Sequence, residues 1–375
     1  MIRVLTFGRF ADENFGGVER YVFELAHALK GRVDFTNIVA RRGGVPDVDM
    51  AAHMIYASPV AYLAGAPFCP SMPFHARRVH RAKPFDIVHL QFPADPMAHV
   101  AALVLPRRVK RVITWHADIV RQQNFLRFYT PFLKRLVQCA DAVILPTPAH
   151  FTSSPQLGNW ISADEAFVVP FGLDYSRFAK RPPLADEIRA RRANQFLVFA
   201  LGRHVYYKGF DYLIRAMAQL PNARLIIGGN GPLTKELTLL ARHLVLEDRV
   251  ELIGRIPDDD LPAYYHACDV FCMPSIERAE AFGLVQIEAM AAGKPVLCCE
   301  LGNGVTWVNQ HGVTGWVVPP KDVQALAKAL HLLADDSALR SRLGAQAKQR
   351  ALTVFSREPM ARDTLAVYKK VLAGR

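Results

Sequence analysis

The sequence lacks the features of membrane-spanning segments and of structural metal sites. It contains no apolar run of about 18 residues, and its N-terminal stretch MIRVLTFGRF passes quickly into polar residues, so neither a membrane span nor a signal peptide is expected. Its six cysteines include no CxxC pair and no Cys/His cluster with zinc spacing. We therefore expect a cytoplasmic protein without a metal site, in which the adjacent Cys298 and Cys299 are buried core thiols.

Several common catalytic and binding motifs are also missing. No GxGxxG follows the first expected strand, and AAGKPV lacks the upstream glycine and the following Ser or Thr of a P-loop. HExxH and GxSxG are absent, which argues against the usual metalloproteases and serine hydrolases. No RNP, KH or helix-turn-helix pattern is present, so a basic nucleic-acid-binding protein is a weak alternative and no nucleic-acid partner is expected.

Positive charge is concentrated in one part of the chain. The formal net charge is +12, and residues 75–135 contain twelve Lys or Arg but three acids. A surface of this sign attracts phosphate-bearing partners, such as nucleic acid, anionic lipid or a charged substrate, and the attraction does not distinguish among them. A solvated basic face without a partner is the alternative.

Short apolar runs alternate with longer helical patterns through both halves of the chain. This alternation favours parallel sheets covered on both faces, and its two series predict two Rossmann-like, doubly wound α/β domains. The expected strands are Ile2–Phe7, Asp86–Leu90, Arg111–Thr114, Ala142–Pro146, Phe167–Pro170, Phe196–Leu201, Arg224–Ile227, Val250–Leu252, Val270–Met273 and Pro295–Cys298. The expected helices are Gly17–Leu29, Phe125–Cys139, Phe210–Gln219, Pro232–Leu244, Leu261–Ala267, Leu284–Ala292 and Val323–Ala334.

The stretch PFGLDYSRFAKRPPLADEIRARRANQ separates the two series. It combines glycine, adjacent prolines and dense charge without a clear strand, so we place the first domain at 1–172, a linker at 173–194 and the second domain from 195. Ligands of open α/β sheets bind outside the carboxyl ends of the strands. The cleft between two such domains facing each other is therefore the expected ligand site.

Two motifs of the first half lie at such strand ends. Gly16 and Gly17 stand between the first strand and a helix, where the backbone can approach a ligand and the helix N-terminus attracts an anion. A plain turn is the alternative for this pair. His116, in TWHAD, follows a strand and is a candidate for the ligand-binding edge, although a lone histidine is more often part of the core.

The loop LGRHVYYKG in the second half carries two cations. Arg203 and Lys208 follow a strand, and Gly209 permits a tight turn into the next helix. Two fixed cations at a helix entrance form a clamp for a diphosphate that needs no metal, and they act most strongly on the charge that a leaving group develops. The next motif, IIGGNGP, includes Gly229, and its glycines let a flat ligand lie against bare backbone.

The run PSIERAEAFGLVQIE is the strongest constellation in the chain. Gly283 lies where a loop becomes a helix, so the N–H groups of Phe282, Gly283 and Leu284 can face an anion or a sugar hydroxyl. Glu280 lies on the loop and Glu288 about a turn and a half into the helix, which predicts two separate hydroxyl acceptors. Taken singly, each glutamate could equally be an ordinary surface residue.

Together, GGVERY, WHAD, GRHVYYKG, GGNGP and EAFGLVQIE resemble the retaining family-4 glycosyltransferases of GT-B fold, from the first strand to about Pro320. EAFGLVQIE matches the E-x7-E motif of that family. VYYKG and ELGNGVTWVNQHGVTGWVVPP look most like bacterial enzymes that add mannose, rhamnose or related sugars to lipid-linked O-antigen and exopolysaccharide repeats. A nucleotide-sugar 2-epimerase and a sugar phosphorylase of the same fold are alternatives, but no sequence feature supports the pyridoxal phosphate that a phosphorylase needs.

The resemblance implies a role for each donor-side motif. Arg203 and Lys208 would bind the donor diphosphate, Glu288 the ribose hydroxyls, and Glu280 with the backbone of 282–284 the transferred sugar. Gly229 would belong to the same donor site. The family's final helix returns to the first domain, so we expect a nucleotide-sugar domain at 195–357 and a returning helix at 358–375.

The resemblance also implies roles beside the reacting sugar, the acceptor and the nucleotide base. His116 would lie beside the reacting sugar, Gly16 and Gly17 would border the diphosphate and the acceptor, and the backbone near Ile256 would border the nucleotide base. WHAD departs from many relatives, which carry a small polar residue or glycine before the aspartate, and this leaves Asp118 without an assigned role.

The resemblance implies a metal-independent transfer of a hexose with retention of anomeric configuration. No cofactor is expected, and the donor would be a nucleotide sugar, with GDP-sugars preferred over UDP-sugars. The predicted acceptor is a glycan or a lipid-diphosphate-linked oligosaccharide of bacterial surface polysaccharide synthesis. The basic stretch then predicts peripheral binding to the anionic inner face of the plasma membrane.

Overall fold

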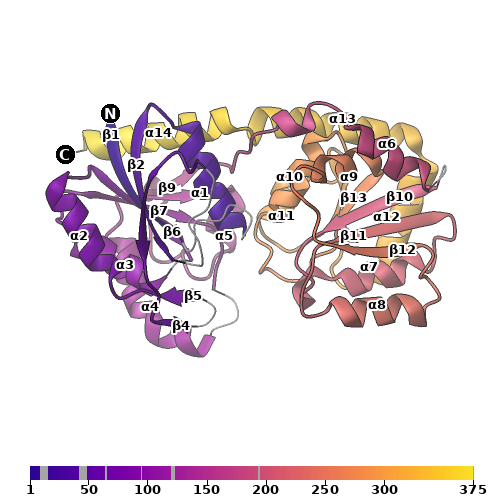
Figure 1. Cartoon of the computed structure of the whole chain (residues 1–375), viewed down its shortest axis with the longest axis horizontal. Coiled ribbons are helices and arrows are strands. Elements are labelled where there is room, and N and C mark those ends of the chain that lie inside the picture. The colour runs from indigo at the N-terminus through magenta and orange to yellow at the C-terminus, as the bar shows by residue number, and fades with distance from the viewer. Residues whose placement is uncertain are drawn as a thin grey trace. The chain divides into compact units, whose positions relative to one another are not determined.

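The computed structural model describes residues 1–8, 16–41, 49–63, 66–93, 95–119, 123–192 and 195–374, with the backbone alone at 63, 66 and 123–128. The chain forms two compact units, Met1–Leu173 with Ser356–Arg375, and Asp174–Phe355. Each unit is built on its own parallel sheet with helices packed around it (Figure 1). The predicted pair of Rossmann-like α/β units is thereby confirmed.

The first unit contains a seven-stranded parallel sheet. In spatial order its strands are β3 (His53–Ala57), β2 (Val33–Ala40), β1 (Ile2–Gly8), β6 (Ile87–Phe92), β7 (Lys110–Trp115), β8 (Ala142–Leu145) and β9 (Ala166–Val168). The strand order reverses between β1 and β6, which places a topological switch point at their carboxyl ends. Two further strands, β4 (Ala61–Leu63) and β5 (Ala66–Phe68), form a small antiparallel pair.

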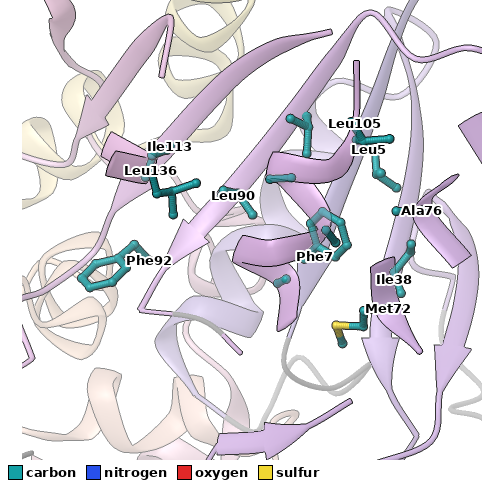
Figure 2. Close-up of a cluster of buried hydrophobic side chains, with 14 of the residues drawn as sticks. Leu5, Phe7, Ile38, Met72, Ala76, Leu90, Phe92, Leu105, Ile113 and Leu136 are labelled. Carbon is teal, nitrogen blue, oxygen red and sulfur yellow. The ribbon is translucent and has the colours of Figure 1, made fainter. Parts of the chain in front are cut away.

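The two faces of this sheet differ in chemistry because side chains alternate along each strand. One face contributes to the main hydrophobic core, together with residues of α2, α3 and α4; Figure 2 shows Leu5, Phe7, Leu90, Phe92 and Ile113 among them. The alternate positions of β1, β6 and β7 carry buried polar side chains: Thr6, His89, Gln91, Thr114 and the adjoining His116. The helices of the first unit are α1 (Gly17–Ala28), α2 (Met72–Ala82), α3 (Pro96–Val104), α4 (Gln123–Gln138), α5 (Pro148–Ser153), the 3₁₀ turn η1 (Ala163–Glu165) and α14 (Arg357–Ala373).

The second unit contains a six-stranded parallel sheet. In spatial order its strands are β12 (Val250–Gly254), β11 (Ala223–Gly228), β10 (Phe196–Leu201), β13 (Val270–Met273), β14 (Val296–Cys299) and β15 (Gly315–Val318). The order reverses between β10 and β13. The helices are α6 (Pro183–Ala190), α7 (Phe210–Met217), α8 (Thr234–His243), α9 (Leu261–Ala267), α10 (Leu284–Ala291), α11 (Gly304–Val308), α12 (Val323–Asp335) and α13 (Ser337–Val354), with 3₁₀ turns η2 (Ser176–Phe178) and η3 (Tyr206–Lys208).

The six cysteines are free, and the predicted burial of Cys298 and Cys299 in β14 is confirmed. Within the described residues, four α-helices begin with a side-chain cap: Asp95 accepts from the Met97 amide at α3, Asn303 from Val305 at α11, Asp322 from Ala325 at α12, and Asp336 from Leu339 at α13. Such caps satisfy N–H groups that the first helical turn leaves without acceptors.

The chain differs from the expected organisation at the segment 173–194. From Asp174 onward this segment belongs to the second unit rather than to a connecting linker. Its helix α6 packs against α9, and Arg189 donates to Asp269 at 2.6 Å. The prolines and charges therefore begin a packed helix. The final helix α14 packs against α1 and β7 of the first unit (Figure 1).

Candidate functional site

The switch point of the second sheet brings two predicted site residues into direct contact. Lys208 follows β10 and Glu280 follows β13, and these strands are neighbours although they are far apart in the sequence. The Lys208 Nζ donates to Glu280 Oε2 at 2.5 Å. Both side chains are 12% exposed. The Ser275 hydroxyl donates to the same carboxylate oxygen at 3.1 Å.

The loop after β10 and the loop after β13 are held together by backbone contacts. The Ile276 amide donates to the Tyr207 carbonyl at 2.8 Å. Gly209 has φ +64°, and a Cβ there would lie 2.2 Å from the Pro274 carbonyl oxygen. A side chain at this position would force the loops apart, so the predicted need for glycine in YYKG has a structural cause. The Tyr206 hydroxyl adds a bond to the Glu277 carboxylate at 2.7 Å.

The Lys208 ammonium sits in a partly dehydrated site beside the Glu280 carboxylate. Burial alone lowers the pKa of Lys208, but the charge of Glu280, the neighbouring Tyr207 and the hydrogen bond to Glu280 raise it, and the net shift is upward. Glu280 Oε1 has no hydrogen-bond partner among the described residues, whereas Oε2 has two. The carboxylate is thus anchored through one oxygen and able to accept a further hydroxyl through the other.

Arg203 lies five positions before Lys208 on the same loop and is exposed. In the described part of the chain it makes no hydrogen bond or ion pair. A charged side chain beside a fixed, buried cation is suited to an anion such as a diphosphate.

The glycine loops after β11 and β12 pack against this same edge. The Gly229 amide donates to the Gly254 carbonyl at 2.7 Å, and a Cβ at Gly229 would lie 2.1 Å from the Gly202 carbonyl oxygen. Ile256 is buried, and its Cδ1 would lie 2.6 Å from a Cβ at Gly228. The loops following β10, β11 and β12 therefore form one continuous backbone surface.

Glu288 lies in α10 and has two partners that the sequence motifs did not indicate. Arg177 Nη2 donates to Oε1 at 2.8 Å, and the Tyr265 hydroxyl donates to Oε2 at 2.9 Å. Burial, followed by the charge of Glu288, raises the pKa of Tyr265 well above its ordinary value, so this hydroxyl keeps its proton. Each carboxylate oxygen retains a free lone pair for a ligand hydroxyl. Arg177 and Tyr265 therefore hold the Glu288 carboxylate in place.

The start of α10 carries the backbone groups predicted to face a ligand. Gly283 is the N-cap residue, with φ +77°, and Leu284 is the first helical residue. The first-turn amides of a helix have no intrahelical acceptor, so those of Gly283 and Leu284 are available to an anion. Phe282 is buried, and its carbonyl accepts from the Gln286 side chain at 2.6 Å.

His116 lies in the first unit, directly after β7. Its ring is 6% exposed, and Nε2 lies 2.8 Å from the Gln91 side-chain oxygen on β6. Burial lowers the pKa of His116 to about 3, and the neighbouring His89 and His150 act in the same direction. The imidazole is therefore neutral near pH 7. Because His116 Nε2–H donates a hydrogen bond to Gln91 Oε1, the lone pair of His116 lies on Nδ1.

Asp118 has a structural task in the loop after β7. Its Oδ1 accepts from the Trp115 indole at 2.9 Å and from the Ser154 hydroxyl at 2.6 Å. Gly16 and Gly17 are the N-cap and first residue of α1, as the sequence predicts. Residues 9–15, which precede them, lie outside the described residues.

No group of three or more His, Cys, Asp or Glu side chains in the described ranges is arranged to hold a metal ion. Within the same ranges, every helix is too short or too polar to cross a bilayer.

Comparison with known proteins assigns both halves of the chain. Residues 184–350 match the family model described as glycosyl transferases group 1, and residues 15–177 match glycosyltransferase family 4. The O-antigen chain mannosyltransferase C of Escherichia coli is 28% identical, with all of both chains covered. The D-rhamnosyltransferase WbpZ of Pseudomonas aeruginosa is 29% identical over 95% of this chain and 92% of the relative. The MMP alpha-(1->4)-mannosyltransferase of Mycolicibacterium hassiacum is 31% identical over 83% of this chain and 77% of its own.

Solved structures share the architecture. A sucrose-phosphate synthase from Thermosynechococcus elongatus superposes with a TM-score of 0.84 at 23% identity over all of both chains. Anabaena Alr3699/HepE, in complex with UDP and glucose, superposes with a TM-score of 0.80 at 21% identity over 99% of this chain and 100% of that one. At these identities the structures establish the fold, and the sequence matches establish the family. The chain belongs to the family-4 glycosyltransferases of GT-B fold.

Proposed function

We propose that this glycosyltransferase moves a hexose, mannose or a related sugar, from a nucleotide-diphosphate sugar to a glycan or lipid-linked oligosaccharide with retention of configuration. The observation that carries the proposal is the contact of Lys208 with Glu280 at the switch point of the second sheet. There a cation suited to a phosphate and a carboxylate suited to a sugar hydroxyl are held side by side. Relatives named for mannosyl and rhamnosyl transfer support the sugar class.

On this proposal the second unit binds the donor in three parts. Lys208 has three N–H groups, of which Glu280 occupies one, so it can bridge that carboxylate and a phosphate oxygen while exposed Arg203 approaches the diphosphate. Glu280 Oε1, with the amides of Gly283 and Leu284, would take the transferred sugar. Glu288 would accept from the ribose hydroxyls, and the backbone beside Gly229 and Ile256 would border the base.

The proposed reaction is a substitution on one face of the donor sugar. The bond between the anomeric carbon and the diphosphate breaks, and the acceptor oxygen attacks from the same face of the sugar. The departing phosphate oxygen takes the acceptor proton, so no protein base is required. Lys208 and Arg203 stabilise the negative charge that grows on the leaving group, without reorganisation during the step. Neutral His116, with Nδ1 free to accept, would orient a hydroxyl of the reacting sugar, while Gly16 and Gly17 would border the acceptor.

We further propose a GDP-sugar as the donor, without a cofactor or metal. The mannosyl transfer in the names of the relatives supports GDP, whereas UDP is bound in the HepE structure. The loops that would meet the base present backbone, so base choice rests on shape and carbonyl positions rather than on a charged side chain. GDP against UDP is therefore the first comparison to make.

The acceptor side carries a surface suited to an anionic membrane. In α2, Phe74 is 74% exposed, and Arg77, Arg78 and Arg81 are exposed as well. The spacing i, i+3, i+4 and i+7 places all four on one helical face. An exposed aromatic ring among arginines fits peripheral binding to anionic lipid on the inner face of the plasma membrane. A lipid-diphosphate-linked acceptor would be found on the same surface.

A donor screen followed by product analysis tests the proposal. Thermal unfolding would be followed with GDP, UDP and ADP and with their sugars, because a ligand stabilises in proportion to the logarithm of its saturation. We expect GDP and GDP-mannose to raise the unfolding temperature most, and a glycan product with retained configuration to form when acceptor is added. A changed nucleotide sugar without acceptor would favour the 2-epimerase instead. Stabilisation by none of the nucleotides would overturn the donor assignment.

A further inference from the structure

The polar face of the first sheet contains a buried network that begins on the last helix of the chain. The Tyr368 hydroxyl of α14 lies 2.7 Å from His89 Nδ1 on β6, and His89 Nε2 lies 2.7 Å from the Thr114 hydroxyl on β7. The Tyr21 hydroxyl of α1 lies 3.4 Å from the same Thr114 oxygen. Four elements are thus joined at one point, although α14 lies more than 240 residues after Thr114 in the sequence.

All members of this network are enclosed and uncharged. Tyr368, His89 and Thr114 are 0% exposed, and Tyr21 is 1% exposed. Burial lowers the pKa of His89 to about 3 and raises that of Tyr21 to about 12. A neutral imidazole carries one N–H, so His89 donates to one hydroxyl and accepts from the other. Removing either hydroxyl leaves a ring nitrogen without its partner and releases the ring orientation.

The network ends against His116. Thr114 lies in β7, and His116 directly follows this strand, where its amide still donates to the Phe92 carbonyl of β6; the two side chains therefore lie on the same face. The Tyr21 ring packs edge-on against the His116 ring, with centroids 4.9 Å apart and an interplanar angle of 77°. Phe171 contacts both rings, at 4.7 and 5.0 Å. The hydrogen bond to Thr114 therefore positions the Tyr21 hydroxyl, and the Tyr21 ring in turn positions the His116 ring.

We infer that Tyr368 is a positioning residue for His116, acting through His89, Thr114 and Tyr21. The inference rests on the proposed function for the role of His116, but not for the contacts themselves. On this inference the returning helix α14 contributes to catalysis. Its Tyr368 hydroxyl orders the residues that position Tyr21, and the His116 imidazole packs against the Tyr21 ring. Tyr21 and Phe171 hold the His116 ring in its orientation. The hydrogen bond from His116 to Gln91 then fixes the tautomer of that ring.

The test removes one hydroxyl and observes His116 directly. Tyr368→Phe keeps the ring of Tyr368 and removes its bond to His89. We expect the imidazole ¹⁵N resonances of His116 to shift in the ligand-free protein and kcat to fall about 10-fold, less than the 10²-fold cost of a 1 Å misplacement. The dissociation constant for GDP, measured by calorimetry, should stay unchanged because donor contacts lie in the second unit.

Tyr175→Phe is the matched control. Its buried hydroxyl donates to the Phe355 carbonyl at 2.8 Å, within the second unit, so its loss costs a comparable bond away from His116. Unshifted His116 resonances in Tyr368→Phe, or an equal fall of kcat in Tyr175→Phe, would overturn the inference. If Tyr368→Phe does not fold, Thr114→Val breaks the network at its other end and should give the same shift. The resonances are read without turnover, so a failure of the proposed function would show separately, as absence of nucleotide binding.

Discussion

Lys208 and Glu280 form an ion pair at 2.5 Å that joins the loops after two neighbouring strands of the second sheet. The pair is buried enough to exclude most water, and a third residue, Ser275, donates to the same carboxylate oxygen as Lys208. A free lysine at a phosphate site would lose rotamer entropy when the ligand binds. Here the ammonium is already held in place, so that entropy is lost during folding rather than during binding.

Replacing Lys208 with alanine should lower kcat about 10²-fold or more, the scale of losing one preorganised charge contact. The cause is the loss of the cation that stabilises the departing diphosphate. Initial rates with saturating donor measure the effect, and circular dichroism confirms folding. Lys235→Ala removes an exposed lysine from α8 and serves as control, for which we expect the wild-type rate. Near wild-type turnover in folded Lys208→Ala would contradict the assignment of this residue.

Glu288→Gln should weaken GDP binding about 10-fold, because a hydrogen bond to a charged group contributes about 1.5–3 kcal/mol. The amide keeps the shape of the side chain but loses one acceptor oxygen and its charge opposite Arg177. Calorimetric titration measures the dissociation constant. Glu236→Gln, on the exposed side of α8, is the matched control. Equal affinities in the two variants would remove Glu288 from the nucleotide site.

The motif residues of this site could be predicted from the local sequence pattern. The residues that hydrogen-bond to them from elsewhere in the chain could not. Parallel strands end at one edge, so residues that follow β10 and β13 meet there whatever the intervening sequence. Arg177 and Tyr265 reach Glu288 from 111 and 23 residues away, and no motif marks either residue. Gln91 likewise meets His116 from the neighbouring strand, one residue beyond the strand that the local pattern predicts, Asp86–Leu90.

The errors in the predicted fold have the same origin. β2, Val33–Ala40, was not predicted, because VDFTNIVA mixes polar residues into the strand. Its polar residues Thr36 and Asn37 are nevertheless buried. Local hydrophobicity does not reveal a strand that buries polar side chains. The segment 173–194 is dense in charge, but part of that charge is neutralised by tertiary pairing, as Arg189 with Asp269 shows.

Activity should persist in EDTA, because the proposed site neutralises the diphosphate with Arg203 and Lys208. Product formation would be measured after dialysis against the chelator and again after magnesium or manganese is restored. We expect the two rates to agree within about twofold. A metal that stabilised the charge of the transition state would contribute several kcal/mol, and its removal would lower the rate far more than twofold. Strict dependence on the added ion would contradict the two-cation clamp.

Anionic vesicles should bind the protein through α2. Sedimentation with vesicles of phosphatidylglycerol and phosphatidylcholine should show binding that grows with the anionic fraction and falls with salt, at about 1 kcal/mol per surface cation. The triple variant Arg77→Ser, Arg78→Ser and Arg81→Ser should lose most of it. A variant with Lys235→Ser and Arg242→Ser on α8 removes charge from the second unit and should bind normally. Binding indifferent to anionic lipid would remove the membrane proposal.

Acid should destabilise the fold before the carboxylates titrate. Burial lowers the pKa values of His89, His99 and His116 to about 3, whereas an unfolded histidine has a pKa near 6.5. Between these values the unfolded chain binds more protons than the folded one, so the free energy of unfolding falls as pH falls. For three such residues the loss between pH 7 and 5.5 is about 4 kcal/mol. Urea titrations at the two pH values measure it, and His99→Gln should reduce the difference by about 1.3 kcal/mol. A free energy of unfolding that is constant over this interval would show that these imidazoles are protonated inside the fold.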